Sequence, residues 1–454
     1  MLLTSLMSFE SFERLAALLG REHACECGRR HAVPTRHVVY AEDAAEELAR
    51  LMREESGGAA VTVIADARTW EVAGRELARA CRVAGWLVKE HIVPDGARGT
   101  PVCDDVTFEG MQAGVPAADV YLAAGSGVIN DLTKWLAHAR GAPYGVMATA
   151  ASMNGYAAAN VAPSVRGVKV LERAQAPLIV AARPSVLASA PWRLTAAGLG
   201  DVLAKPVSVA DWRLNHELLG EHFCPTCAEL ISGLEPLYAE QPHRLRAGDA
   251  AALGGLFYAL VYSGVAMTMM GSSAPASGGE HLFSHTLDMM DAVDGGGHDL
   301  HGRQVGVGTI IAAELHRRVW AHERPEVRAV PQAVDERLWG RLVPAVAAQY
   351  AAKQEGLRGI AAAMKDTQRW SAVRSMIKTA VPSPGEIARR LKAAGAACSL
   401  ADITVARARA REAVLHMHEI RARTTIVDVA WLAGVLPGAV EELMDEMGCM
   451  DGMD

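Results

Sequence analysis

A strand, a glycine-rich turn and a helix follow one another between residues 118 and 140, and this succession narrows the possible folds more than any other stretch. Residues 118–124 (ADVYLAA) have the composition of a buried parallel strand. The chain then enters Gly125-Ser126-Gly127-Val128-Ile129, and residues 132–140 continue as a helix. This layout turns backbone N–H groups and a helix N-terminus toward one point, where a pyrophosphate can bind. The full GxGxxG motif is absent, so the prediction of a nucleotide site rests on this context.

Further segments predict the rest of a parallel sheet. Ala59–Ala65 is a continuous apolar, β-branched segment, and Tyr144–Ala148 is a further short apolar one. Val88–Val93 is predicted as a second strand. Gly167–Arg173 and Ala176–Ala181 have the pattern of edge strands. Because these strands alternate with helical segments, the sequence predicts an α/β domain of the Rossmann-like type.

Polar and small residues follow two of these strands, at the sheet edge where ligands bind in such folds. Asp66 ends the first strand and is placed to accept hydrogen bonds from an adenosine ribose. It would repel a 2′-phosphate and favour NAD over NADP, although a role as a helix N-cap is equally compatible with the sequence. Thr149-Ala150-Ala151-Ser152 forms a turn after the strand 144–148 and is a second candidate for ligand contact.

The character of the chain changes after residue 183. The following 270 or so residues have few β-branched alternations and many helical periods rich in Ala, Leu and Arg, for example Pro344–Gln354, Pro384–Ala394 and Ile403–Arg421. We therefore predict two domains in an α/β plus all-α architecture. Residues 1–183 form the nucleotide-binding domain, and residues 184–454 form a helical domain.

Charge and hydropathy exclude several classes of function. The formal net charge of -7 argues against nucleic acid as the main partner. Residues 251–270 carry no charge and are long enough to span a bilayer, but their glycines, hydroxyls and lack of basic flanks favour a core helix. Because no secretory leader is recognisable at the N-terminus, we expect a cytoplasmic protein without a membrane span.

Three histidines in the helical part predict a divalent-metal site. His281 and His285 are four residues apart, so a helix presents both imidazoles on one face. His301 follows the flexible Gly295–Gly297 segment, which allows a second helix start to return to this pair. Asp201 in Gly198-Leu199-Gly200-Asp201 is either the N-cap of a helix or the anionic member of an Asp/His/His set.

The eight cysteines are scattered and do not form a disulfide framework. Cys25-Glu26-Cys27-Gly28, close to His23 and His31, has a spacing compatible with zinc, but without a second cysteine pair we favour a surface turn with free thiols. Cys224-Pro225-Thr226-Cys227 is a single CxxC, and it predicts a redox or zinc role only weakly.

Taken in order, several of these motifs resemble one enzyme family. The ordered segments resemble those of the sn-glycerol-1-phosphate dehydrogenases, within the superfamily of iron-type alcohol dehydrogenases, glycerol dehydrogenases and dehydroquinate synthases. The opening CxCG and the closing Glu419–Ile426 resemble the bacterial branch, so the resemblance extends over nearly the whole chain. The segments that carry it are Gly125–Lys134, Thr149–Ser152, Gly198–Asp201, Glu280–His285, and His301-Gly302 with Val305-Gly306.

The resemblance implies a dehydroquinate synthase-like fold, an active site in a cleft and a homodimer. It implies that Asp201, His281 and His301 bind one divalent metal ion, with Asp201 also touching the substrate and His285 contacting it beside the metal. It further implies that the 125–129 segment holds the pyrophosphate of NAD, with NADP also possible, and that 149–152 contacts the nicotinamide half. Zinc, nickel and iron(II) all suit a mixed oxygen and nitrogen ligand set.

The reaction expected from this resemblance is hydride transfer between a nicotinamide and dihydroxyacetone phosphate, which gives sn-glycerol 1-phosphate. The cation polarises the carbonyl, and His285 relays the proton. Two positions depart from the family: Asn154 replaces a common Asp that reaches the substrate, and Ala158 replaces a hydroxyl residue. Asn154 keeps an acceptor but loses the charge. The alternatives are therefore a dehydrogenase of an unphosphorylated polyol such as glycerol, a dehydroquinate-synthase-like lyase, or a catalytically weak paralogue with a binding role.

Overall fold

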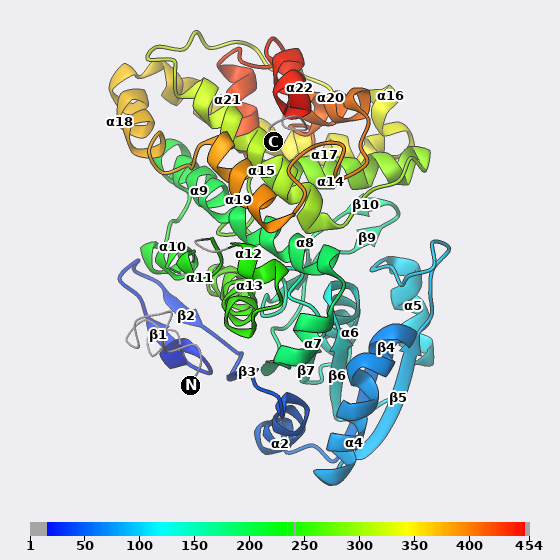
Figure 1. The fold of residues 1–454 in the computed structure, drawn as a ribbon. Helices are drawn as coiled ribbons and strands as arrows, with labels where there is room; N and C mark the ends of the chain where they lie inside the picture. The colour runs from blue at the N-terminus through cyan, green and yellow to red at the C-terminus, as the bar shows by residue number, and fades with distance from the viewer. Residues whose placement is uncertain (1–15, 234, 240–241, 450–454) are drawn as a thin grey trace. The chain divides into compact units, whose positions relative to one another are not determined.

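A six-stranded parallel sheet forms the centre of the first of two units (Figure 1). The computed structural model describes residues 16–233, 235–239 and 242–449. The first unit contains the chain up to Gly198 together with Thr226–Ser272, and the second contains Leu199–Pro225 and the chain from Ser273 onward. In spatial order the strands are β3 (His37–Tyr40), β12 (Ile179–Ala182), β7 (Tyr144–Ala148), β6 (Val120–Gly125), β4 (Ala60–Asp66) and β5 (Leu87–Val93).

Helices cover both faces of this sheet. α2 (Ala44–Ser56) and α4 (Arg75–Val83) form one apolar cluster with the strands, and α3 (Ala67–Thr69) and the π-helical turn η1 (Trp70–Gly74) lead into α4. α6 (Gly127–Ala139) packs on β6 and β7 and contacts α5 (Asp105–Gly114). Because β4 has β5 on one side and β6 on the other, the connections diverge at β4, and ligands of such sheets bind at this point.

The remaining elements of the first unit are short hairpins and helices. The strand pairs are antiparallel. α7 begins with Pro184, whose fixed φ suits the first helical position. The hairpins are β1 (Glu22–Ala24) with β2 (Arg30–Ala32), β8 (Asn160–Val161) with β11 (Glu172–Arg173), and β9 (Ser164–Val165) with β10 (Val168–Lys169); the helices are α7 (Pro184–Ser189), α10 (Pro225–Ser232), α11 (Pro236–Ala239), α12 (Pro242–Arg246) and α13 (Ala250–Met270).

The predicted fold class is confirmed, but two strand predictions were wrong. The segment 176–181 was expected at an edge, whereas β12 lies inside the sheet between β3 and β7. β3 itself was missed because its four residues are only half-buried and carry no long apolar segment. Residues 167–173 do not join the main sheet and instead form parts of the two hairpins β9–β10 and β8–β11.

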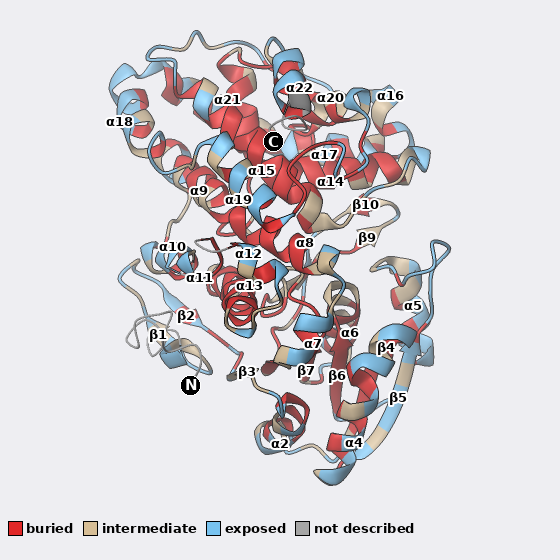
Figure 2. Cartoon of the chain, in the orientation of Figure 1, coloured by how far each residue is buried: buried red, intermediate tan, exposed pale blue. Residues whose placement is uncertain are grey.

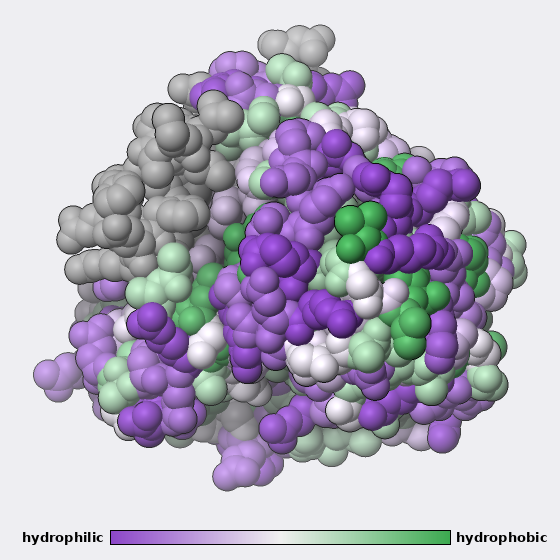
Figure 3. Space-filling view, turned by 90° about the horizontal axis from the view of Figure 1, so that it is seen from below, coloured by the Kyte–Doolittle hydropathy of each residue, from purple (hydrophilic) through white to green (hydrophobic). Residues whose placement is uncertain are grey.

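Helix α13 is the one described helix long and apolar enough to span a membrane, and it is 89% buried over its most apolar window. It contacts α7, α11 and β2, which is the behaviour of a core helix. Most side chains on the face shown in Figure 3 are hydrophilic, and hydrophobic residues form separate small patches there. Among the described residues, the segment predicted as a core helix is therefore inside the protein.

The second unit is helical. Its centre is the pair α14 and α15, which make the most extensive helix contact in the chain and are drawn almost entirely as buried in Figure 2. α9, α19, α20 and α21 pack around this pair. The helices are the end of α8 (Trp192–Leu203), α9 (Lys205–Leu219), α14 (Gly279–Asp294), α15 (His301–Val319), α16 (Glu336–Trp339), η2 (Gly340–Leu342), α17 (Val343–Lys365), α18 (Thr367–Ile377), α19 (Pro384–Ala394), α20 (Arg407–His416), α21 (Ile426–Leu432) and α22 (Val440–Cys449).

The units do not divide at residue 184 as the change in composition suggested. Residues 184–198 and 226–272 belong to the unit that contains the sheet. The physical reason is α13, whose surface is apolar on every side and therefore has to be surrounded. Composition alone assigned it to the helical part because its sequence lacks strand alternation.

Candidate active site

The glycine turn after β6 has the geometry that the sequence predicts. β6 ends at Gly125, and α6 begins two residues later at Gly127. A Cβ atom on Gly125 would lie 2.6 Å from the Cβ of Ile129, so only glycine fits this sharp turn. No side chain caps the helix start at Ser126, and the first N–H groups of α6 remain available for an anion. The role of this turn in binding a pyrophosphate stays a prediction.

The turn after β7 is held against the glycine turn. The amide of Thr149 donates to the carbonyl of Gly125 at 3.1 Å. Ala150 and Ala151 are fully buried, and the Tyr156 hydroxyl donates to the carbonyl of Ala150 at 2.6 Å. The predicted contact residues 149–152 and 125–129 therefore lie together at the carboxyl edge of the sheet.

Lys134 fixes the loop that continues from this turn. Its buried ammonium donates to the carbonyls of Gly155 at 2.6 Å and Asn160 at 3.0 Å. Burial lowers the pKa of Lys134, and the nearby Asp131 acts in the opposite direction. Lys134 thus anchors the loop that carries Asn154. The role of Asn154 in substrate binding stays a prediction.

Asp66 lies at the end of β4, in register with the end of β6, as predicted. Its carboxylate accepts from the amides of Arg68 at 2.7 Å and Thr69 at 3.0 Å, and the Thr69 hydroxyl completes a capping box. The N-cap role is therefore present. Both bonds use one carboxylate oxygen, and the other oxygen lies at the same sheet edge. The binding of a ribose by Asp66 remains a prediction.

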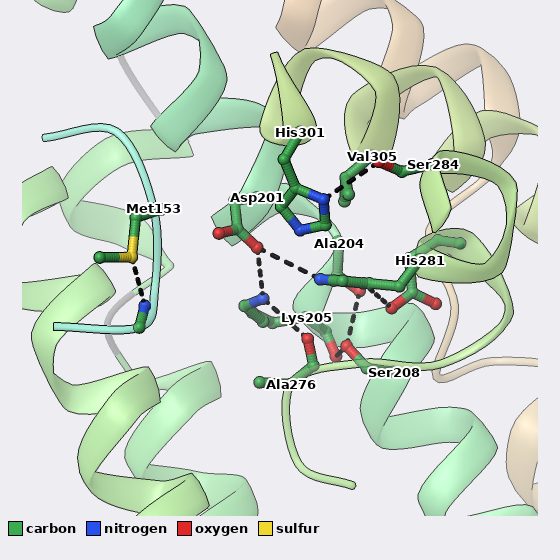
Figure 4. A network of polar contacts seen from close by, with 12 residues as sticks. Met153, Asp201, Ala204, Lys205, Ser208, Ala276, His281, Ser284, His301 and Val305 are labelled. Carbon is green, nitrogen blue, oxygen red and sulfur yellow. Dashed lines mark hydrogen bonds and ion pairs between the residues drawn. The ribbon is translucent and has the colours of Figure 1, made fainter. Parts of the chain in front are cut away.

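The second unit brings together the predicted metal ligands. Asp201, His281 and His301 each offer a ligand atom, and these atoms all lie within 4.8 Å of one another. His281 and His285 share one face of α14, and His301 is the first residue of α15. Asp201 lies inside α8 and is fully buried, so the alternative of an N-cap role is wrong. Figure 4 shows the three side chains pointing toward one another.

Two glycines allow the helices to approach this closely. A Cβ on Gly200 would lie 2.2 Å from the carbonyl oxygen of Gly302, at the start of α15. A Cβ on Gly308 would lie 2.4 Å from the carbonyl oxygen of Glu280 on α14. Any larger residue would separate α8 or α14 from α15. The glycine before Asp201 is therefore required to place this carboxylate beside His301.

Hydrogen bonds fix which ring nitrogen of His281 and of His301 carries the proton. Nδ1 of His281 donates to the Glu280 carboxylate at 2.8 Å, which leaves Nε2 with its lone pair 3.5 Å from Asp201 Oδ1. The Ser284 hydroxyl donates to Gln304 at 2.9 Å, so its oxygen accepts from Nδ1 of His301 at 3.0 Å. Both histidines therefore present a lone pair on Nε2, as metal ligands with such partners do.

His285 has the opposite arrangement. Its Nδ1 lies 3.0 Å from a guanidinium nitrogen of Arg421. Because arginine can only donate, Nδ1 of His285 is an acceptor and Nε2 carries the proton. The His285 ring lies 5.4 Å from the His301 ring and 6.0 Å from the His281 ring, measured between centroids. The geometry thus separates two histidines that present a lone pair on Nε2 from one whose Nε2 carries the proton.

A buried lysine compensates the charge of Asp201. Lys205, one helical turn later in the chain, donates to Asp201 Oδ1 at 2.9 Å and to the carbonyl of Ala276 at 2.9 Å. Burial would raise the pKa of Asp201, but the positive charge of Lys205 acts in the opposite direction and holds the pKa well below its usual range. Asp201 is therefore available as an anionic ligand.

Sequence reasoning missed four residues of this site: Lys205, Glu280, Ser284 and Arg421. Glu280 and Ser284 stood inside the histidine motif, but only the folded hydrogen bonds reveal that they orient the ligands. Arg421 stood in the closing segment that was singled out without a role. Burial lowers the pKa of Arg421 to about 10, and the structure gives this guanidinium no carboxylate among the described residues.

Comparison with known proteins gives the family. The model of the iron-containing alcohol dehydrogenases matches residues 39–191. A glycerol-1-phosphate dehydrogenase [NAD(P)+] of Halalkalibacterium halodurans is 30% identical over 406 residues, which is 89% of this chain and 94% of the relative. The chain belongs to the glycerol-1-phosphate dehydrogenase family. Members of this family are metal-dependent, NAD(P)-linked oxidoreductases that act on a CH–OH group, and this chain is an enzyme of that type.

Further members and structures agree with this assignment. The glycerol-1-phosphate dehydrogenase of Pyrococcus furiosus is 33% identical over 289 residues, 63% of this chain and 80% of its own. Among solved structures, an NADH-dependent butanol dehydrogenase of Thermotoga maritima superposes with a TM-score of 0.58 at 13% identity, over 92% of this chain and 97% of its own. A probable glycerol dehydrogenase of Sinorhizobium meliloti superposes with a TM-score of 0.56 at 16% identity, over 91% of this chain and 98% of its own. These two structures share the fold of the glycerol-1-phosphate dehydrogenase family.

Proposed function

We propose that this protein interconverts dihydroxyacetone phosphate and sn-glycerol 1-phosphate, with NAD(H) as the hydride carrier and one divalent cation held by Asp201, His281 and His301. The observation that carries the proposal is the arrangement around His285. Two histidines offer lone pairs and a third carries its proton on Nε2. The guanidinium beside this third histidine has no carboxylate partner in the described part of the chain. A metal-assisted reduction of a phosphorylated ketone can use all three elements.

The donor set suits a catalytic cation. Three protein ligands leave coordination positions for substrate oxygen, and a bound cation would polarise the carbonyl. Glu280 and Ser284 hold the two imidazoles in the orientation that binding requires, and Lys205 holds the carboxylate. Because all of these partners are buried, the ligands are fixed before a substrate arrives.

His285 is the proposed proton donor. In the reductive direction the carbonyl oxygen becomes an alkoxide and requires one proton. His285 directs its Nε2–H toward this oxygen, while Arg421 occupies Nδ1 and keeps the ring in this tautomer. Because loss of the Nε2 proton alone would leave an imidazolate, the ring acts as a relay: Nε2 gives its proton to the alkoxide while Nδ1 takes one up from water in place of the Arg421 contact. In the oxidative direction Nε2 accepts the proton of the substrate hydroxyl and Nδ1 releases one to water.

Arg421 supports a phosphorylated substrate. Its backbone has a φ of 63°, which is uncommon for a residue other than glycine and costs on the order of 1–3 kcal/mol. The amide of Arg421 donates to the Gln349 side chain at 2.7 Å, which holds this conformation. The neighbouring Arg423 is paired with Glu221 at 3.2 Å, whereas the partners of Arg421 within residues 16–233, 235–239 and 242–449 are neutral. A half-buried cation of this kind is stabilised by an anion, and a phosphate monoester supplies one.

A second candidate is a dehydrogenase of free glycerol or a similar polyol. Its support is Asn154, which replaces the carboxylate that the family resemblance leads one to expect at this position. We rank it below the phosphorylated substrate because a neutral polyol would leave the charge of Arg421 uncompensated. A homodimer, a cytoplasmic location, a preference for NAD, and zinc, nickel or iron(II) as the cation belong to the same proposal.

Oxidation of glycerol phosphate tests the proposal directly. We expect the metal-loaded enzyme to reduce NAD⁺ with sn-glycerol 1-phosphate and to leave the sn-glycerol 3-phosphate enantiomer unused. NADH absorbance should rise in proportion to the substrate consumed. Equal rates with both enantiomers, or a rate with glycerol that exceeds both, would contradict it. A lyase that recycles its nicotinamide would release no NADH at all.

A further inference from the structure

The hairpin β1–β2 carries a second group of possible metal ligands, outside the site of Asp201. The sulfur atoms of Cys25 and Cys27 and a ring nitrogen of His31 lie within 4.8 Å of one another. Cys27 Sγ is 3.2 Å from Nε2 of His31. From bond lengths of about 2.0–2.3 Å, two ligand atoms of one tetrahedral zinc ion are roughly 3.5 Å apart. The sequence suggested a surface turn with free thiols, but both sulfurs have polar partners.

The second nitrogen of His31 fixes its tautomer. Nδ1 lies 2.8 Å from the carbonyl oxygen of Met269, which can only accept, so Nδ1 carries the proton. Nε2 therefore presents its lone pair to Cys27. A histidine that donates its other N–H to a backbone carbonyl is the usual form of a metal ligand. His31 is 1% exposed, although it belongs to a hairpin whose other residues are largely open to water.

The hairpin is short, and its main contact outside the two strands is with α13. Its register pairs Glu22 with Ala32 and Ala24 with Arg30, and the turn is closed by a bond from the Cys25 amide to the Arg29 carbonyl at 2.9 Å. The strands have three residues each, and His31 is the one fully buried side chain between them. A two-stranded hairpin of this size is at best marginal in water, so a cross-link would add to the support that β2 receives from α13.

We propose that Cys25, Cys27, His31 and Cys224 bind a structural zinc ion. Thr226 brings the fourth ligand to the hairpin: its hydroxyl lies 3.3 Å from the Cys25 sulfur and donates to Glu26 at 3.4 Å. Cys224 is separated from Thr226 by a single proline, so the covalent chain keeps its thiol close, and its sulfur belongs to the same group of ligand atoms.

Zinc is the cation that this ligand set selects. Three thiolates and one imidazole form a closed tetrahedral site of the structural type, with no position left for substrate. The Asp201 site has three ligands, of which none is a thiol, and remains open. Binding converts three thiols to thiolates and releases their protons, so affinity falls as the pH is lowered. The zinc ion thus ties the hairpin to the start of α10, independently of the proposed reaction.

Metal analysis of the full-length chain tests the inference. The double variant Asp201→Ala/His281→Ala removes the open site, and we expect the purified protein to retain about one zinc ion per chain. Adding Cys25→Ser/Cys27→Ser to it should remove this zinc and lower the melting temperature. Cys224→Ser should do the same, whereas Cys227→Ser, a buried cysteine of the same segment, should keep the zinc.

Two results would overturn the inference. One is a folded Asp201→Ala/His281→Ala protein without zinc after growth in zinc-supplemented medium. The other is equal zinc content in the Cys224→Ser and Cys227→Ser proteins. Should a cysteine variant not fold, cobalt(II) exchanged into the wild-type chain decides: thiolate-to-cobalt charge-transfer absorption supports the site, and its absence, or a Cys25–Cys27 disulfide found by mass spectrometry, contradicts it.

Discussion

Changing Asp201 to Asn or His281 to Ala is expected to reduce turnover by roughly 10³-fold or more. In the proposed site Asp201→Asn removes the negative charge of one ligand and His281→Ala removes another ligand outright, and a bound cation contributes several kcal/mol of transition-state stabilisation. Asn is preferred to Ala at 201 because it keeps an oxygen near the buried ammonium of Lys205, which lies 2.9 Å away. Steady-state NADH oxidation at saturating metal, with circular dichroism to verify folding, measures the effect.

A nearby histidine is the matched control. His298 precedes α15 by three residues and is more exposed, with its ring near Asp288 and Asp291 rather than in the ligand group. His298→Ala should keep turnover within a few-fold of the wild type. If His281→Ala is folded and equally active, the assignment of the metal site to this part of the chain is wrong.

Changing Arg421 to Ala is expected to lower kcat/KM for dihydroxyacetone phosphate by roughly 10- to 100-fold and to leave that for dihydroxyacetone much less affected. A charge-assisted hydrogen bond to a phosphate contributes about 1.5–3 kcal/mol. The effect should appear mainly in KM if Arg421 binds the substrate in its ground state. Arg421→Lys should recover part of the loss, because it keeps the charge but not the fork of donors. Kinetics with both substrates measure the preference for phosphate.

An exposed arginine on α20 is the control for the Arg421 variant. Arg411 is paired with Glu441 at 2.7 Å on the exposed side of α20, so Arg411→Ala should leave the substrate preference unchanged. If Arg421→Ala lowers kcat equally for both ketones, Arg421 acts only by orienting His285. An unchanged preference for the phosphorylated ketone would show that another group binds the phosphate.

The sequence was most informative where burial is complete. The strands β4, β6 and β7 were placed to within one or two residues because almost all of their side chains are buried, which requires continuous apolar segments. The positions of β3 and β12 in the sheet were not predicted correctly, because a four-residue strand carries too little sequence pattern to identify the strands beside it. Sheet order depends on pairing between segments distant in sequence, and periodicity does not contain it.

The same distinction holds for the site. His281 and His285 were predictable from a four-residue spacing on one helix, and the family motifs named Asp201 and His301. The different roles of these histidines were not predictable, because they depend on which ring nitrogen each partner occupies. The contact between Arg421 and His285 escaped prediction for a related reason: the two residues lie more than a hundred residues apart in the chain.

Metal-dependent reduction of two ketones is the most direct test of the account. The wild-type enzyme would be depleted of its labile metal, supplied with zinc, nickel or iron(II), and assayed for NADH oxidation with dihydroxyacetone phosphate beside dihydroxyacetone. The account predicts turnover that returns with metal and strongly favours the phosphorylated ketone. Turnover that is independent of metal, or that favours free dihydroxyacetone, would contradict it.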